Sequence, residues 1–449
     1  MANTYLYKNQ GTATNAKKFT YSVWLKRSAI DTSASQRFYQ GWQSSDNRFY
    51  AYFVEGADSN EDRLWIYAVT GGTIEVYWVS NRRFRDTNAW YHIVFSADST
   101  QASQGDRFKV YVNGVEETSW TKTNNPSQNI DWGNQLAQTN GDLTISGTEG
   151  QTQMFDGLMS HIHFIDGTAY DASAFGSTDA TTGEWKINTS PSVTYGSQGY
   201  FILKDDNSNL DRSGNNNHFT IGGTLTKTED NPSNVFATLN PLEKLGSNLL
   251  IYAGNTAAYN TSSDWRTMIS NLAFPNTGKF YAEMKVEEVS SAVQVGIMAQ
   301  SSFSGAEASQ LGQLGQYNSY GYKNNGEKIS NSSSSSYGNS FAGGIIGIAV
   351  DMDNKNIYFS KDGVWQNSGN PESGATGTGA AFTDLQNDKD YMFAAASQGS
   401  NPEVFWNFGN GIFDRTLVSS AGTNASGIGI FEYDVPTGFT ALSTKGLNL

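Results

Sequence analysis

Residues 107–117 read R-F-K-V-Y-V-N-G-V-E-E, an alternating run that ends in Asn-Gly and is followed by a second short run. Asn-Gly or Asp-Gly between alternating runs is the strongest short-range signal for a β-hairpin. Residues 356–366 read N-I-Y-F-S-K-D-G-V-W-Q and repeat this pattern about 250 residues later. Because the surrounding segments differ, the two hairpins predict two antiparallel β domains in tandem.

Composition supports this prediction and limits the partners. The 449 residues suffice for two or three domains, and 37% hydrophobic with 13% aromatic residues can form packed cores. Only 16% of residues are charged, against about 25% in typical globular chains, so the surface relies on uncharged polar residues and 46 glycines. The net charge of −14 repels phosphate backbones, and we expect no nucleic-acid partner.

Cysteine usage and the termini bear on localisation. The chain contains no cysteine, which excludes disulfides, thiolate metal sites and a cysteine nucleophile. The N-terminal M-A-N-T-Y-L-Y-K-N-Q lacks the apolar region of a secretory signal, and no run of 18 apolar residues predicts a membrane span. We expect synthesis in a cytoplasm; if the protein works outside a cell, something else carries it there.

The sequence predicts an all-β chain of two antiparallel, jelly-roll-like β-sandwiches. Short alternating strands fill residues 1–226, and similar strands resume in residues 242–449. Residues 227–241, K-T-E-D-N-P-S-N-V-F-A-T-L-N-P, contain two Asn-Pro steps and predict a linker. Residues 331–338, N-S-S-S-S-S-Y-G, predict a loop too polar to pack.

The first half resembles the laminin-G-like, concanavalin A-like sandwich. The pieces that carry the resemblance are T-Y-S-V-W-L-K-R, A-W-Y-H-I-V-F, K-V-Y-V-N-G-V, F-D-G-L-M-S-H-I-H-F-I-D-G and L-D-R-S-G-N-N-N-H-F, in the order of that family. They cover about 200 residues. The resemblance implies a sandwich over residues 1–226.

The second half resembles the SPRY domain over residues 270–410. The pieces are K-F-Y-A-E-M-K-V, V-Q-V-G-I-M, Y-G-Y-K-N-N-G-E-K, G-I-I-G-I-A-V-D-M-D-N-K-N-I-Y-F-S-K-D-G and V-F-W-N-F-G-N. One departure is A-G-G-I-I-G, where the family usually has an acidic residue before the first apolar position. The resemblance implies a SPRY-like sandwich with a C-terminal extension in residues 242–449.

The whole arrangement also resembles virion proteins of tailed phages, particularly those of marine hosts. In these a laminin-G-like module is joined by an Asn-Pro-rich segment to a SPRY-like module, and the ending D-V-P-T-G-F-T-A-L-S-T is similar. The resemblance implies a non-enzymatic tail fibre or tail-associated adhesin on the particle surface. Its partners would be other virion proteins, further copies of itself (a trimer is favoured) and a host surface polysaccharide or receptor. The alternatives are a capsid-decoration or collar protein, and a polysaccharide depolymerase.

Oxygen-bearing side chains at every second position suggest a calcium site. The candidate ligands, at the spacing that hard cations use, are Asp205, Asn207, Asn209 and Asp211. Leu210 stands where an EF-hand loop needs glycine, so the alternative is a polar turn in which these side chains bond their own backbone. No other cofactor is expected.

Two further pairs of titratable residues invite a chemical interpretation. His161 and His163 share a strand face and are candidates for a metal pair, against the alternative of a hydrogen-bonded buried pair. Asp351 and Asp353 are spaced for paired-carboxylate chemistry, but they also fit the end of a strand that enters a turn. We find none of the common hydrolase or nucleotide-binding motifs, and we expect no enzyme.

Basic and aromatic residues complete the candidates. The one dense basic spot is Arg82, Arg83 and Arg85, expected as a solvated loop end or as a contact with an acidic neighbour. Flat rings stack on sugar faces, and rings near predicted turns or strand ends are candidates for glycan or receptor binding: Trp42, Trp78, Tyr322 and Trp365. Trp65 has a similar setting. The alternative for each is a place in a core or an interface.

Overall fold

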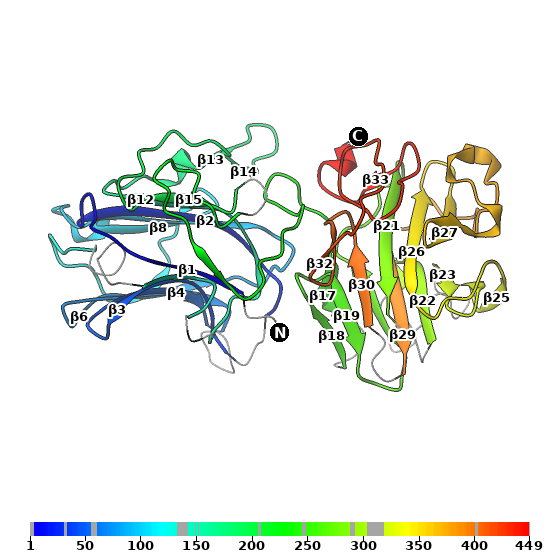
Figure 1. Cartoon of the computed structure of the whole chain (residues 1–449), viewed down its shortest axis with the longest axis horizontal. Helices are drawn as coiled ribbons and strands as arrows, with labels where there is room; N and C mark the ends of the chain where they lie inside the picture. The colour runs from blue at the N-terminus through cyan, green and yellow to red at the C-terminus, as the bar shows by residue number, and fades with distance from the viewer. Residues whose placement is uncertain are drawn as a thin grey trace. The chain divides into compact units, whose positions relative to one another are not determined.

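The computed structural model describes residues 4–30, 34–54, 61–132, 142–148, 150, 152–204, 208–244, 248–287, 292–302, 318–399 and 403–448. They form two compact units, Met1–Lys227 and Thr228–Leu449, each built mainly from antiparallel strands (Figure 1). This confirms the predicted all-β class with two β-sandwiches in tandem. Each unit is described below by itself.

The N-terminal unit consists of two stacked sheets, with β2 and β8 above β3 and β4 in Figure 1. The larger sheet has the order β10 (Trp120–Asn124), β6 (Thr73–Arg83), β5 (Arg63–Thr70), β4 (Asn47–Phe53), β3 (Gln36–Ser44), β11 (Asp142–Ile145), β1 (Tyr5–Asn9) and β16 (Thr220–Gly222). The smaller has the order β15 (Tyr200–Ile202), β12 (Gly157–Asp166), β2 (Lys18–Arg27), β7 (Tyr91–Asp98), β8 (Phe108–Val112) and β9 (Val115–Glu116).

Aromatic rings from both sheets meet in the core of this unit. Phe19 of β2 has its ring 6.0 Å from that of Phe49 on β4 and 5.7 Å from that of Trp132. All three side chains are buried, and burying each contributes roughly 1.5–3 kcal/mol to folding. The inward positions of the alternating strands therefore hold the two sheets together.

Both predicted hairpin turns are present. Asn113 and Gly114 have φ of 48° and 81°, and Asp362 and Gly363 have φ of 49° and 78°. Two consecutive residues with positive φ match the twist of the flanking strands, which is why Asn-Gly and Asp-Gly occupy such turns. The first turn joins β8 to β9, and the second joins β27 to β28.

The C-terminal unit also stacks two sheets. One has the order β17 (Leu239–Lys244), β20 (Arg266–Ser270), β29 (Tyr391–Gln398), β22 (Ala292–Ala299), β23 (Ser319–Lys323), β24 (Glu327–Ser330) and β25 (Ser333–Ser336). The other has the order β18 (Leu249–Tyr252), β19 (Ala257–Asn260), β30 (Glu403–Asn407), β21 (Lys279–Val286), β26 (Gly344–Asp351), β27 (Asn356–Lys361) and β28 (Val364–Trp365), with β33 (Thr440–Ala441) parallel to β21.

Short elements complete the chain. The remaining strands are β13 (Gly176–Thr178), β14 (Trp185–Ile187), β31 (Ile412–Phe413) and β32 (Thr416–Leu417). The 3-10 turns are η1 (Gln104–Asp106), η2 (Ala172–Ala174), η4 (Gln300–Ser302), η5 (Gln366–Ser368), η6 (Pro371–Thr376) and η7 (Gly446–Asn448). Among the described residues, no helix is long and apolar enough to cross a bilayer.

Two segments differ from the sequence predictions. Residues 227–241 are not a free linker, because Phe236, Ala237 and Leu239 are buried in the C-terminal unit, which begins at Thr228. The Asn-Pro steps indicated irregular structure, but the apolar residues between them find a core. The serine-rich residues 331–338 do not form a simple loop: β25 pairs with β24 and exposes all four of its serines.

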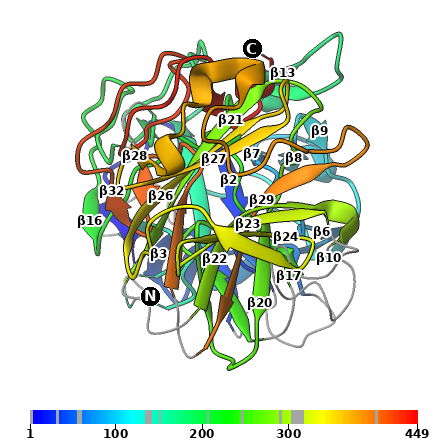
Figure 2. The same ribbon diagram turned by 90° about the vertical axis from the view of Figure 1, so that its right-hand side faces the viewer.

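The C-terminal segment, red in Figure 2, covers part of the sheet that contains β21. Its Phe431 and Phe439 are buried in a cluster with Tyr281 of β21. The carboxylate of Glu283, also on β21, accepts hydrogen bonds of 2.9 Å from the backbone N–H groups of Glu432 and Tyr433. A fully buried acid therefore anchors this segment, and burial raises the pKa of Glu283 to about 7.

Candidate functional site

The outer face of the larger N-terminal sheet is built by the alternation of its strands. In β4, Phe49, Ala51 and Phe53 point into the core and are fully buried, whereas Tyr50 and Tyr52 lie half-buried on the opposite side. β3, β5 and β6 add further outward rings. We call these six rings the aromatic face: Trp42, Tyr50, Tyr52, Trp65, Tyr67 and Tyr77.

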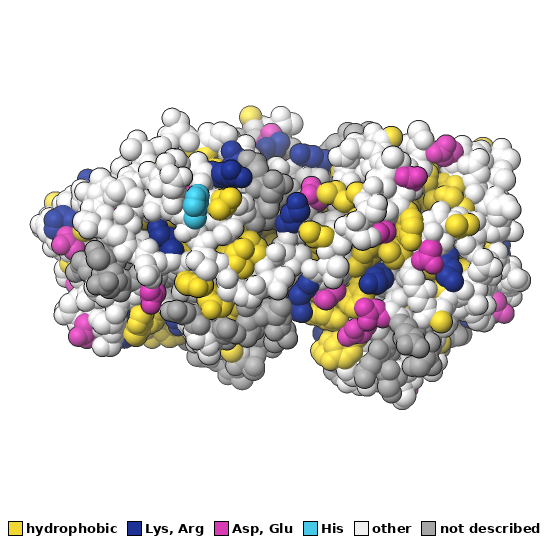
Figure 3. Space-filling view, in the orientation of Figure 1, with side chains coloured by type: hydrophobic (Ala, Val, Ile, Leu, Met, Phe, Trp, Pro, Cys, Tyr) yellow, Lys and Arg dark blue, Asp and Glu magenta, His cyan; other side chains and the backbone are white. Residues whose placement is uncertain are grey.

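One row of rings crosses four strands. Trp42 and Tyr50 have centroids 6.2 Å apart and planes 5° apart, and Tyr50 and Tyr67 lie 6.2 Å and 19° apart. Tyr67 then meets Tyr77 edge to face at 5.9 Å. Since adjacent strands are about 4.8 Å apart, the row extends for about 14 Å. Hydrophobic side chains also reach the surface in patches on this unit (Figure 3).

A second row runs beside the first. Tyr52 and Trp65 are paired across β4 and β5, with centroids 5.6 Å apart and planes 18° apart. Trp65 contacts Tyr77 edge to face at 5.0 Å, which joins the two rows. The rings hold one another in place, so the surface is ordered before any ligand arrives. Such preorganisation reduces the entropy cost of binding.

Two guanidinium groups lie on these rings. The central carbon of Arg37 is 3.9 Å from the centroid of Tyr50 and 5.8 Å from that of Tyr52. That of Arg48 is 5.3 Å from the centroid of Tyr67. Burial raises the pKa of both Tyr50 and Tyr52, and the phenols remain protonated at neutral pH. The face therefore combines neutral aromatic rings with fixed positive charge.

Several donors at this face have no acceptor within the described part of the chain. They are the Nε atoms of Arg37 and Arg63 and the Nε1 atom of Trp65. Leaving a buried donor unpaired costs about 1–3 kcal/mol. Flat rings together with hydrogen-bond donors suit a sugar chain, which offers C–H faces and many oxygens.

The four aromatic residues predicted to bind a glycan or receptor lie in different settings in the structure. Trp42 lies in the aromatic face. Trp78 is 3% exposed; its Nε1–H donates to the carbonyl of Asn124 at 2.7 Å. Tyr322 is fully buried in the C-terminal unit, and Trp365 is half-buried in the cluster that contains Tyr281. Trp78 and Tyr322 are thus core residues with no ring face open to a sugar, because they occupy inward positions of their strands.

Sequence reasoning missed most of the aromatic face. The sequence candidates include Trp42 and Trp65 of this face but not Tyr50, Tyr52, Tyr67 or Tyr77. The signal was available as the alternating runs F-Y-A-Y-F and L-W-I-Y-A, in which every second residue is an outward ring. The runs predict two-faced strands, but only the fold shows which face lies on the outside.

The proposed calcium ligands lie partly outside the described residues. Asp205 and Asn207 are not described. The carboxylate of Asp211 accepts backbone N–H groups of Phe201 and Ser213, both at 2.8 Å, and Asn209 donates through Nδ2 to the carbonyl of Phe219. These contacts are those of a hydrogen-bonded turn. Among the described residues, no group of three or more His, Cys, Asp or Glu is arranged for a metal.

His161 and His163 both contact the ring of Phe201, with centroid distances of 5.7 and 3.9 Å. A β-bulge at this point gives His161 a φ of 46°. His163 is buried, and its Nδ1 is 2.9 Å from the hydroxyl of Tyr195. Burial lowers the pKa of His163, so the ring is neutral. This arrangement agrees with the hydrogen-bonded alternative for the pair.

A serine and a histidine also meet in the N-terminal unit. Ser22 Oγ is 2.8 Å from His92 Nε2, and Trp185 Nε1–H donates to His92 Nδ1 at 2.9 Å. Since Nδ1 accepts this bond, a neutral ring must carry its proton on Nε2 and donate to Ser22. A general base needs the opposite tautomer, with Nε2 free to take the serine proton. The pair is therefore structural.

Asp351 and Asp353 close a turn at the end of β26. Asp351 is fully buried, forms an ion pair with Lys279 at 3.1 Å and accepts the backbone N–H of Asp353. Asp353 accepts the backbone N–H of Gly278 at 2.8 Å. These bonds confirm the interpretation of the two carboxylates as the end of a strand that enters a turn.

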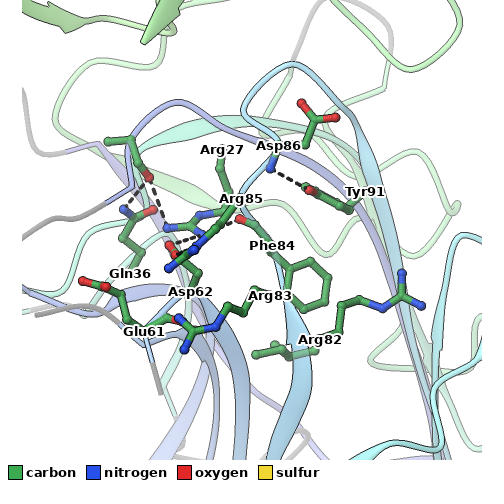
Figure 4. Close-up of polar contacts among 12 residues, drawn as sticks. Arg27, Gln36, Glu61, Asp62, Arg82, Arg83, Phe84, Arg85, Asp86 and Tyr91 are labelled. Atoms are coloured by element: carbon green, nitrogen blue, oxygen red, sulfur yellow. Dashed lines mark hydrogen bonds and ion pairs between the residues drawn. The ribbon is translucent and has the colours of Figure 1, made fainter. Parts of the chain in front are cut away.

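The basic spot is an ion-paired cluster (Figure 4). Arg27 and Arg85 both reach the buried carboxylate of Asp62, at 3.2 and 2.6 Å. Arg82 pairs with Glu117 at 2.7 Å. The expected contact with an acidic neighbour is confirmed for Arg82 and Arg85, and the cluster fixes the end of β6 to β2.

Comparisons with known families agree with this architecture. Residues 2–173 match the model of the concanavalin A-like lectin/glucanases superfamily, and residues 279–411 match the SPRY domain. The first match includes all six rings of the aromatic face. The N-terminal unit thus contains a region that matches concanavalin A-like sandwiches and the C-terminal unit a region that matches SPRY domains, and such modules are typically binding modules rather than catalytic ones. A search of curated proteins found no match.

Solved structures resemble the chain at low identity. The SPRY domain of human HERC1 is 15% identical, with a TM-score of 0.29 over 37% of this chain and 96% of that one. Stonustoxin is 17% identical, with a TM-score of 0.27 over 38% of this chain and 27% of its own. A heptameric SAP-like pentraxin from Limulus polyphemus is 13% identical, with a TM-score of 0.31 over 50% and 90%. The assignment of the modules rests on the family models.

Proposed function

We propose that this chain is a non-enzymatic attachment protein that recognises a surface polysaccharide through its aromatic face. The observation that carries the proposal is the two-row platform of six rings on an outer sheet face. Rings that build a core point between the two sheets. These six rings point away from the core, on the outer face of the larger sheet, and they still contact one another in order. The two binding-type modules support the same function.

The setting we propose is the particle surface of a tailed phage, as a tail fibre or tail-associated adhesin. This rests on the resemblance of the module order, the Asn-Pro-rich segment and the C-terminal motif to virion proteins. A flat platform makes many weak contacts, and several copies on one particle raise the overall affinity through avidity. A homo-oligomer, with a trimer favoured, would supply those copies.

Host adsorption tests the attachment role. The purified chain should bind host cells and compete with particle adsorption, whereas Tyr67→Ala should lose most of this competition. Tyr259→Ala is the matched control, because Tyr259 is also a half-buried strand tyrosine but lies on β19 of the other unit. Equal competition by both variants would contradict the role of the aromatic face.

The place on the particle needs a separate measurement. Antibody labelling of particles, viewed by electron microscopy, should mark the tail. Label spread over the capsid would instead support a decoration protein, which is the structural alternative.

A further inference from the structure

We infer that the polysaccharide recognised by the aromatic face is acidic, carrying carboxylate groups such as those of uronic acid residues. The inference rests on the proposed function and specifies the ligand of the same surface. Its basis is the position of three arginines: Arg37, Arg48 and Arg63.

These three arginines lie on the aromatic face, unlike the ion-paired arginines of the N-terminal unit. Arg27 and Arg82 each pair with a carboxylate, at 3.2 and 2.7 Å. Arg37, Arg48 and Arg63 have no ion pair with a described carboxylate. Among the described residues they have no acidic partner, in a chain with 43 acidic and 29 basic residues.

Arg37 is the most informative of the three. It is 9% exposed, and its terminal nitrogens donate to the amide oxygens of Gln40 and Gln153. These neutral acceptors orient the guanidinium without neutralising it, and Nε has no partner. Burial lowers the pKa of Arg37, which shows the cost of holding a charge there. A buried charge without a counter-ion is costly, and a bound anion would remove that cost.

Arg48 extends the positive charge along the face. Its guanidinium lies near Trp42 and Tyr67, at 5.9 and 5.3 Å from their centroids, and donates to Tyr67 Oη at 3.4 Å. Arg63 lies two residues before Trp65 on β5, and its Nε is also unpartnered. Planar guanidinium groups match carboxylates through paired hydrogen bonds.

β3, β4 and β5 carry no acidic residue, and the acidic residues described on β11 and β6 lie at the borders of this arrangement. Asp142 pairs in register with Trp42 at the β11 side. Glu75 on β6 accepts the backbone N–H of Ser127 at 2.7 Å, which occupies it locally. A neutral polymer would use the rings and leave the three guanidinium charges unmatched, whereas an acidic polymer would use both.

Matched probes test the inference. Oligogalacturonates and their methyl esters have the same backbone and differ in the carboxylate charge, and a glycan array adds neutral and other acidic chains. We expect acidic chains to bind at least tenfold more tightly than their esters. Arg48→Gln should weaken binding of acidic chains about tenfold and binding of the esters much less, and Arg48→Lys should restore part of the loss. Tyr67→Ala should weaken both.

The outcomes separate the inference from the proposed function. Equal binding of acids and esters that Tyr67→Ala abolishes and Arg48→Gln does not change would overturn the inference and leave the attachment role standing. Binding of no glycan on the array would overturn both. Arg63→Gln is a second variant at the same face, so a folding defect in Arg48→Gln, detected by its melting temperature, does not prevent the test.

Discussion

The guanidinium carbon of Arg37 lies 3.9 Å above the centroid of Tyr50, on the side of the sheet that faces away from the core. This cation is held by the ring's electrons and by the amide oxygens of Gln40 and Gln153 rather than by an acid. Its charge thus remains available to a ligand while its position is fixed. The same pairing of ring and charge recurs at Arg48 and Tyr67, which makes this surface distinct from the ion-paired cluster around Asp62.

The first prediction separates a platform residue from a core residue. Trp42→Ala should weaken glycan binding about tenfold, worth roughly 1.4 kcal/mol, with little change in stability. Trp78→Ala should lower the free energy of unfolding by about 3–5 kcal/mol, because it leaves a cavity beside Phe108. Urea unfolding and binding on the same samples measure both. Similar stability losses in the two variants would show that Trp42 is also structural.

The second prediction concerns the buried ion pair. Asp62→Asn removes the negative charge that faces Arg27, whose side chain is fully buried. We expect a loss of about 3–5 kcal/mol in the free energy of unfolding. Asp106→Asn is the control, because its pair with Lys109 lies on the surface and should change the melting temperature little. A stable Asp62→Asn variant would show that the pair is dispensable.

The third prediction concerns the N-terminal unit in acid. Burial lowers the pKa of His92 from 6.5 to about 3, so the folded unit binds this proton less readily than the unfolded chain. The contribution of His92 to the free energy of unfolding is complete above pH 6.5. It is lost as the pH falls toward 3, by about 1.4 kcal/mol per pH unit. His92→Gln should flatten this loss between pH 6.5 and 5. Hydrogen exchange of β2 and β7 measures this loss of stability with falling pH. The same pH dependence in His92→Gln as in the wild type would contradict the assignment of the loss to His92.

The fourth prediction has the opposite sign and concerns the C-terminal unit. The pKa of Glu283 is raised from 4.5 to about 7, so the folded unit holds this proton more tightly than the unfolded chain. The contribution of Glu283 to the free energy of unfolding is complete below pH 4.5. It is lost as the pH rises through 7, by about 3 kcal/mol in total. Hydrogen exchange of β21 should therefore quicken from pH 5 to 8, after correction for the intrinsic exchange rate. Glu283→Gln should remove this dependence, and a persisting dependence would point to another group.

Local patterns were enough to predict the fold class. The two hairpins and the strand alternation follow from short-range backbone preferences, which act within a few residues. The turns at Asn113-Gly114 and Asp362-Gly363 are the clearest examples, since two successive positive φ angles favour those residue pairs.

Long-range packing determines which strand residues lie in a core and which lie on the aromatic face. Trp42 and Trp78 both lie on strands of the larger N-terminal sheet, yet Trp42 lies on its outer face and Trp78 in the core, because only the second sheet determines which face is covered. Phe236 and Leu239 follow an Asn-Pro step but are buried by distant strands. The aromatic face itself assembles from β3, β4, β5 and β6, and its rings meet only when the register of all four strands is set.

Glycan-array binding by the wild-type chain, Tyr67→Ala and Tyr259→Ala, at equal folded concentration, tests the central claim most directly. The account predicts that the wild type and Tyr259→Ala bind the same glycans with equal affinity, and that Tyr67→Ala binds them about tenfold more weakly. Equal binding by all three proteins, or glycan binding by none, would contradict the claim that the aromatic face is the recognition surface.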